Sequence, residues 1–348
     1  MRTFWKKYFG PVYILFITAV VAGILISNHE LGMIMDALKS LRAHWVWMAA
    51  GCIAVYLLLR MAQLKYYLAR RGYRISWMQA AEVTGAGQFY SAITPSASGG
   101  QPMQLLHLHR MGVPVSTGTA CISVKFLGFQ TGYLLIGGLM LLFRRGMIGQ
   151  QLADFGWLVA LGFVVNAALI AAVLLTIPRT KILERMIRWL IRVGERLHIV
   201  KDGKSALESF QNMLADYRDA LVQLLRSPLD AFVMFALSIA QVIVYMCVIV
   251  CIYRAFGLAS VQSVDLFAIQ LALFIAAAFI PLPGAAGAQE SGFCAFFAGI
   301  FPEASMIPAM LCWRFFSYYL LLGMGLAMMI LPRMRIGKRN SGKSEIDY

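Results

Sequence analysis

Four ionisable side chains stand inside apolar stretches of the sequence, where a charge is costly. Glu82 and Glu290 each belong to a short apolar stretch beside a Gly/Pro-rich break, and Lys125 and Arg314 each lie in the longer apolar stretch that follows. At bilayer depth such groups face a partner or a cavity. Either each acid pairs with the base of its own half, or the bases hold an anion such as a phosphate, which suits arginine geometrically. The sequence leaves both roles open.

Small and polar residues at the two breaks are further candidates for contacts with a ligand. A glutamine lies near the start of the helix expected after each break, where free backbone N–H groups favour anions. The glycines allow close approach, either of a ligand or of the two breaks to each other. We therefore expect a substrate-binding set composed of Glu82, Pro95, Gly99, Gly100, Gln101, Lys125, Pro283, Gly284, Gly287, Gln289, Glu290 and Arg314.

The two breaks match each other in sequence. The first covers residues 94–102 and the second covers residues 281–290. In hydrocarbon an irregular backbone is tolerated only where protein buries it or where it lines a wet cavity. Matched breaks in two halves of a hydrophobic chain are typical of carriers with a central binding site. At an offset of 188 positions, four pairs coincide: Pro95 with Pro283, Gly99 with Gly287, Gln101 with Gln289, and Pro114 with Pro302.

The composition is that of a membrane protein. Hydrophobic residues make up 60% of the chain and charged residues 14%, with a mean hydropathy of +0.71. A soluble domain is closer to half apolar and a quarter charged. We interpret the net charge of +15 as cytoplasmic loops rich in Lys and Arg that face anionic lipid, and we expect no nucleic-acid partner. The expected partners are membrane lipids and anionic head groups, and a homo-oligomer stays open.

The apolar segments predict six full spans and two re-entrant helical hairpins. Each hairpin consists of two short helices around a break, 77–93 with 103–111 and 264–280 with 290–300. Basic residues after the second span and after the last one place both termini in the cytoplasm of a multi-pass cell-membrane protein. The expected spans are 11–26, 45–64, 114–143, 157–177, 229–253 and 304–331.

The whole chain, 1–348, is expected to form one all-α polytopic membrane domain. A first repeat, 11–143, would be followed by a second repeat, 157–331, and the second must be inverted because each half crosses three times. The two hairpins would then enter from opposite sides. Residues 179–226 show helical amphipathic spacing and predict a cytoplasmic helical insertion. The competing topology has each hairpin cross completely, giving ten shorter spans.

Three kinds of polar residue near the apolar segments have expected roles outside the binding set. Arg60 is expected to extend toward the membrane surface. His107 and His109 are expected to be interface residues rather than proton relays, and Asn166 is expected to hold a contact between helices. The sequence shows no nucleophilic triad, metal-ligand cluster or nucleotide loop. We therefore predict no enzymatic activity, no catalytic residues, no metal and no cofactor.

Two groups of residues resemble signatures of a known family. The first is Thr94–Gly100 with the Met111-Gly112 turn and Lys125, and the second is 281–287 with Glu290 and Arg314. They resemble the flippase-like transmembrane domain of lysylphosphatidylglycerol synthases and its stand-alone relatives, across nearly the whole chain. We see no counterpart of the soluble aminoacyl-transferring domain. The resemblance therefore implies translocation of a lipid without the synthesis chemistry.

The leading functional hypothesis is transport of a lipid between leaflets of a bacterial cytoplasmic membrane. The lipid would be a phospholipid, an aminoacylated phospholipid or a polyprenyl-linked lipid, with its head group in a cavity between the hairpins. A second hypothesis is a secondary carrier for a small polar anion. A third is a non-transporting accessory protein that holds a lipid-modifying enzyme on its basic cytoplasmic helices.

Overall fold

The computed structural model describes residues 39–144, 155–174, 226–277, 280 and 282–341, with the single positions 36, 215, 219, 222 and 223. The expected first span, 11–26, and most of the expected insertion, 179–226, lie outside the described residues. The described part is helical and contains no strand, apart from an isolated bridge between Ala298 and Phe301.

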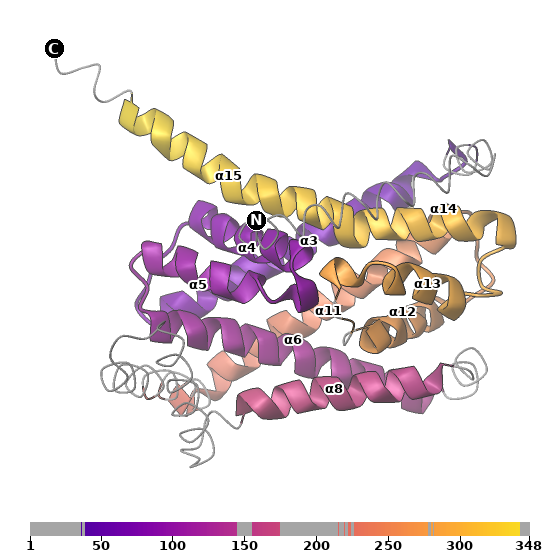
Figure 1. The fold of residues 1–348 in the computed structure, drawn as a ribbon, viewed down its shortest axis with the longest axis horizontal. Coiled ribbons are helices and arrows are strands. Elements are labelled where there is room, and N and C mark those ends of the chain that lie inside the picture. The colour runs from indigo at the N-terminus through magenta and orange to yellow at the C-terminus, as the bar shows by residue number, and fades with distance from the viewer. Residues whose placement is uncertain are drawn as a thin grey trace, which may run out of the picture.

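The helices follow the expected order along the chain (Figure 1). They are α3 (Ala43–Arg70), α4 (Trp77–Ile93), the 3₁₀ turn η1 (Pro95–Ala97), α5 (Gly100–Arg110), α6 (Val115–Phe143), α8 (Gly156–Leu174), α11 (Pro228–Ala255), α12 (Ser263–Ala277), the 3₁₀ turn η2 (Pro283–Ala285), α13 (Ala288–Phe296), α14 (Glu303–Arg314), the π-helical turn η3 (Phe315–Tyr319) and α15 (Leu320–Ser341).

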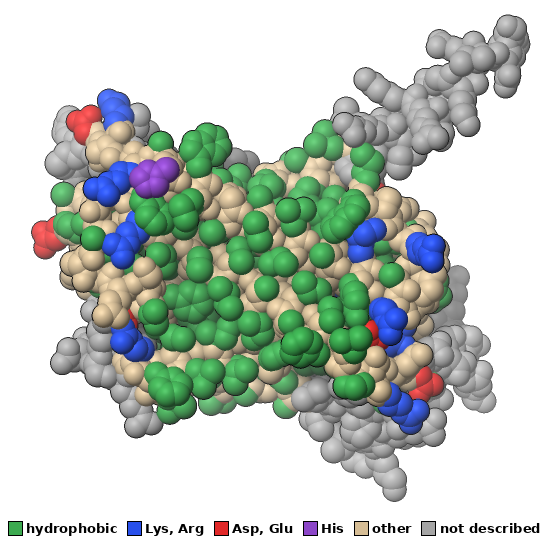
Figure 2. Space-filling view, turned by 180° about the vertical axis from the view of Figure 1, so that it is seen from behind, with side chains coloured by type: hydrophobic (Ala, Val, Ile, Leu, Met, Phe, Trp, Pro, Cys, Tyr) green, Lys and Arg blue, Asp and Glu red, His purple; other side chains and the backbone are tan. Residues whose placement is uncertain are grey.

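Four helical segments in the described part are long and apolar enough to cross a bilayer. They coincide with four of the six expected full spans, and the expected span 157–177 corresponds to the shorter α8. Figure 2 shows a band of apolar side chains across the middle of one face, with Lys and Arg gathered toward the two ends. Such a band suits lipid. The four segments are Ala43–Arg70, Val115–Phe143, Pro228–Ala255 and Glu303–Leu331.

Helices α3 and α11 run antiparallel and are joined at both ends. At one end the N–H of Arg42 donates to the carbonyl of Ala255 over 2.9 Å. At the other, Arg70 Nε and the hydroxyl of Tyr66 lie 2.8 and 2.6 Å from Asp230 Oδ1. Their facing sides supply much of the larger apolar core. Helices α4, α6, α12 and α14 contact one or the other helix of this pair.

The two broken segments occupy opposite ends of the molecule. Helices α4 and α5 lie at the end toward which α15 extends, and α12 and α13 lie at the other (Figure 1). The short turns η1 and η2 contact each other between them. Helix α15 lies along α4, and a Cβ on Gly85 would stand 2.6 Å from the carbonyl oxygen of Gly325. These small residues allow the close helix crossing.

The likeness between the halves extends from residue types to the backbone. The starts of η1 and η2, of α5 and α13, and of α6 and α14 all differ by 188 positions. Pro114 and Pro302 precede the last pair with φ/ψ of −55/144° and −56/147°. Within the turns, Ser96 at 50/27° matches Gly284 at 59/16°. The four coincidences in the sequence thus mark a repeated local structure.

Candidate functional site

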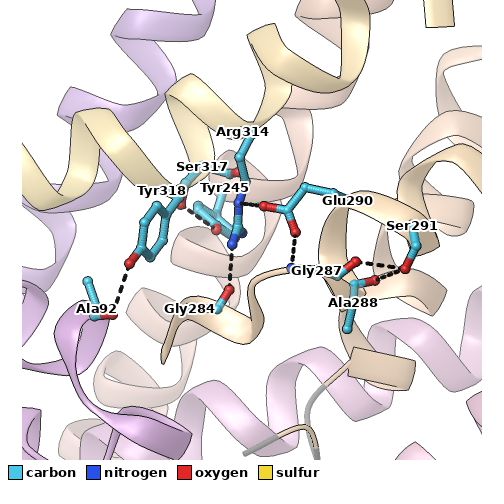
Figure 3. A network of polar contacts seen from close by, with 10 residues as sticks. All are labelled: Ala92, Tyr245, Gly284, Gly287, Ala288, Glu290, Ser291, Arg314, Ser317 and Tyr318. Atoms are coloured by element: carbon cyan, nitrogen blue, oxygen red, sulfur yellow. Dashed lines mark hydrogen bonds and ion pairs between the residues drawn. The ribbon is translucent and has the colours of Figure 1, made fainter. Parts of the chain in front are cut away.

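Arg314, at the end of α14, is the centre of a buried polar cluster (Figure 3). Its side chain is 6% exposed. Its Nε forms an ion pair with Oε1 of Glu290 at 2.6 Å, although the two atoms do not meet the angular requirements of a hydrogen bond. Its Nη2 donates to the carbonyl of Gly284 over 2.7 Å. The predicted pairing of Glu290 with Arg314 is therefore confirmed.

Glu290 also holds the backbone of the break. Its Oε2 accepts a hydrogen bond of 2.7 Å from the N–H of Gly287, just before α13 begins. A carboxylate is favourable in the first turn of a helix because the N–H groups there point toward it. Glu290 thus stabilises the turn and the Arg314 guanidinium together.

Tyr318 joins this cluster to the first half of the chain. The guanidinium of Arg314 lies 4.5 Å from its ring centroid, which is cation–π geometry. Its hydroxyl donates to the carbonyl of Ala92, at the end of α4, over 3.0 Å. A Cβ on Gly284 would lie 2.2 Å from Tyr318 Cε2. At this position the glycine lets the turn pack against an aromatic ring.

The remaining predicted residues of the second break differ in burial. Pro283 is buried, and Gly287 is exposed. Gln289 is 8% exposed, and its Oε1 has no hydrogen-bond partner among the described residues. A buried amide oxygen without a partner is costly, so Gln289 is the residue of this break best placed to gain from a ligand.

The first break is more open than the second. Pro95 and Gln101 are exposed, Gly99 is half-buried and Gly100 is buried. The N–H of Gly99 donates to Oγ1 of Thr94 over 2.9 Å, which closes the turn. The structure therefore joins Gly284, Gly287 and Glu290 of the second break to Arg314. In the first break, by contrast, Pro95 and Gln101 are exposed.

The expected pair of Glu82 with Lys125 is wrong. Glu82 Oε1 lies 2.9 Å from Nδ1 of His107, and both residues are buried. The antiparallel packing of α4 against α5 brings these two positions together, while Lys125 lies on α6 and donates to the carbonyl of Arg60 over 3.3 Å. His107, expected as a membrane-interface residue, is thus buried in the protein, whereas His109 is exposed.

Replacing His107 by Leu should destabilise the protein because it leaves the Glu82 carboxylate buried without this partner. We expect a loss of about 1.5–3 kcal/mol, the usual contribution of a hydrogen bond to a charged group. The change would appear as a lower midpoint in thermal unfolding of the purified protein. His109→Leu is the matched control, because His109 is exposed two residues further along α5. Equal losses for both variants would contradict a buried Glu82–His107 contact.

Arg60 does not extend away from the helix bundle as expected. Its Nη1 donates to the hydroxyl of Tyr56 over 2.7 Å, and its guanidinium lies 5.5 Å from the Tyr56 ring centroid. Its Nε is buried and has no hydrogen-bond partner in the described structure. The rings of Tyr56 and Tyr245 are 5.1 Å apart, and Tyr245 donates to the carbonyl of Ser317. Sequence reasoning missed Tyr56, although it precedes Arg60 by one helical turn.

Asn166 holds two helices together, as predicted. Its Oδ1 accepts a hydrogen bond of 2.5 Å from Nε2 of Gln130, which lies on α6. Its Nδ2 donates to the carbonyl of Gly162 on its own helix over 2.7 Å. This buried contact fixes α8 against α6 and leaves the amide satisfied.

Comparison with known proteins gives consistent matches. Residues 12–325 match the family described as the lysylphosphatidylglycerol synthase TM region. A UPF0104 membrane protein of Archaeoglobus fulgidus is 24% identical over 322 residues, which cover 87% of this chain and 91% of that protein. The matched range takes in both breaks and the cluster around Arg314.

Proposed function

Because the chain belongs to the family of the lysylphosphatidylglycerol synthase transmembrane region, we propose that it moves a lipid between the two leaflets of a cell membrane. The lipid would be a phospholipid, an aminoacylated phospholipid or a polyprenyl-linked lipid. Its head group would be held between the two broken helical segments, while its tails stay among the lipid chains. Family membership supports a membrane role related to lipid, and the geometry of the breaks supports transport.

The architecture that we propose for this activity is an inverted repeat with six full spans, two opposed re-entrant hairpins and both termini in the cytoplasm. The shared offset of 188 positions in the starts of the matched helices supports the repeat. The location of the two hairpins at opposite ends of the bundle supports the inversion (Figure 1). The contact of Arg144 with Asp265, at 2.6 Å, joins the end of α6 to the start of α12, which the predicted topology places on the same outer side.

The observation that carries the proposal is the contact between η1 and η2 beside the ion pair of the buried Arg314 with the half-buried Glu290. Non-helical backbone at membrane depth needs either surrounding protein or a polar chamber. A lipid head group that crosses a bilayer must exchange its hydration for polar protein groups. The turn amides, Gln289 and the charges next to them would supply such groups. Arg314, Lys125 and the residues of both breaks are our proposed contacts.

Reconstitution into vesicles provides the test. Purified protein would be inserted into vesicles that carry a trace of head-group-labelled phospholipid, and a membrane-impermeant reductant would bleach the outer label. Movement of inner-leaflet label to the outside should exceed that in protein-free vesicles. Arg314→Met should slow the movement, whereas Arg74→Gln, which removes an exposed charge, should not.

A negative result in this assay must cover the proposed lipid classes. The absence of movement for phospholipid, aminoacylated phospholipid and polyprenyl-linked probes alike would contradict the proposal. Uptake of a soluble polar anion by the same vesicles, with static lipid labels, would instead favour a secondary carrier.

A further inference from the structure

Two cations inside the bundle form no ion pair with any carboxylate in the described part of the chain. The four carboxylates that are buried or half-buried in the described part of the chain each pair with another residue. Neither Lys125 nor Arg60 lies within ion-pair distance of a carboxylate in that part. The four pairs are Glu82 with His107, Asp230 with Arg70, Asp265 with Arg144, and Glu290 with Arg314.

The donors of these two cations are largely unused. Lys125 is 7% exposed, and its three ammonium protons meet one acceptor in the described structure, the carbonyl of Arg60 at 3.3 Å. Arg60 is half-buried and donates from Nη1 to the hydroxyl of Tyr56, while its buried Nε has no acceptor among the described residues. Helices α3 and α6, which carry the two cations, contact each other. Lys125 and Arg60 therefore bring together uncompensated positive charge and unused hydrogen-bond donors.

Such an arrangement is costly unless an anion completes it. A buried charge loses its hydration, and only a partner of opposite charge with further hydrogen bonds compensates for that loss. Phosphate oxygens accept from guanidinium and ammonium groups in charge-assisted bonds. At Arg314, by contrast, Glu290 already supplies the negative charge. We therefore expect an anion to bind at Arg60 and Lys125.

We propose that Arg60 and Lys125 form a binding site for a phosphate-ester anion. Its occupant would be the head-group phosphate of a membrane lipid, and this identification rests on the proposed function. Free phosphate would be recognised by the same donors. The ring contact of Tyr56 with Tyr245, and the bond from Tyr245 to Ser317, connect this site to the cluster around Arg314. The phosphate is held by α3 and α6, and the rest of the head group reaches the turns η1 and η2.

Lipid binding to the purified full chain in detergent tests the site. Native mass spectrometry would compare phosphatidylglycerol with diacylglycerol of the same acyl chains. The unmodified protein should retain phosphatidylglycerol and not diacylglycerol. Lys125→Met and Arg60→Gln should each weaken phosphatidylglycerol binding about tenfold, the scale of a lost hydrogen bond to a charged group. Arg74→Gln should bind as the unmodified protein does.

Folding and binding are separated by two further measurements. In lipid-free detergent Lys125→Met should unfold at the same temperature as the unmodified protein or higher, because it removes an uncompensated charge. Arg60→Lys, which keeps a cation, should regain part of the binding lost in Arg60→Gln. Equal phosphatidylglycerol binding in all variants, or equal retention of diacylglycerol, would overturn the site.

The source of the phosphate, and the independence of this site from transport, are tested in the same system. Displacement of phosphatidylglycerol by excess inorganic phosphate would support the shared site with free phosphate as an occupant. Failure of inorganic phosphate to displace the lipid would support a lipid occupant. If phosphatidylglycerol binding depends on both cations but the vesicle assay shows no lipid movement, the site stands and the proposed function is overturned. Lipid movement with unaltered binding in both variants would overturn the site and keep the function.

Discussion

Replacing Glu290 by Gln is expected to lower the free energy of unfolding by about 3–5 kcal/mol, the usual cost of removing one partner of a buried ion pair. Glutamine keeps the shape of the side chain and an oxygen for the N–H of Gly287. It leaves the guanidinium of Arg314, whose side chain is 6% exposed, without its counter-charge. Equilibrium unfolding in mixed micelles of increasing denaturing-detergent content would measure the loss.

Two further variants make this prediction sharper. Glu303→Gln is the matched control, because Glu303 is an exposed acid in the first turn of α14. The double variant Glu290→Gln with Arg314→Met should recover a large part of the stability, since an apolar replacement of both partners leaves no uncompensated charge. A Glu290→Gln loss no larger than that of Glu303→Gln would show that the pair is not buried as described.

Replacing Gly284 by Ala is expected to cost about 2–4 kcal/mol, as the sum of a left-handed backbone and a steric clash. The backbone there has a φ of 59°, and an added Cβ would stand 2.2 Å from the ring of Tyr318. The ring cannot move freely because its hydroxyl is bonded to Ala92 and its face covers Arg314. The same unfolding measurement would report the loss.

Gly287→Ala separates the backbone strain from the clash. Gly287 has a φ of 85°, but a Cβ there would meet nothing within 4 Å. With a ψ of −50° this backbone lies outside the left-handed helical region, and we expect about 1–3 kcal/mol from its strain alone. The counterpart of Gly284 in the first half is Ser96, which is exposed and adopts a φ of 50°. A residue with a side chain can therefore occupy this backbone position where no ring packs against it. Equal losses for Gly284→Ala and Gly287→Ala would mean that Tyr318 does not press against the turn.

Part of this arrangement could be predicted because it depends on local sequence. Helix-breaking residues inside apolar runs fixed the positions of η1 and η2, and prolines fixed the starts of α6 and α14. The pairing of Glu290 with Arg314 followed from two opposite charges in neighbouring apolar segments of one half. Each of these predictions needed only the chain neighbours and the requirement that a charge in hydrocarbon find a partner.

The wrong predictions concerned contacts between helices. The pairing of Glu82 with Lys125 failed because His107 lies directly opposite Glu82 across the hairpin, while Lys125 faces α3. The sequence shows which residues are charged, but not which of several helices stands beside each one. The error at Arg60 is of another kind, because its partner Tyr56 lies one turn earlier on the same helix and follows from local spacing.

The packing of α15 along α4 has a consequence for how the protein is made. Gly85 and Gly325 meet at that crossing, although most of the chain separates them. During synthesis α4 is made while α15, the helix along which it packs, is still untranslated. Until the last helix arrives, the hairpin must be shielded by lipid, by the insertion machinery or by other newly made helices. Chains interrupted before α15 should therefore be substrates for membrane quality control rather than smaller working proteins.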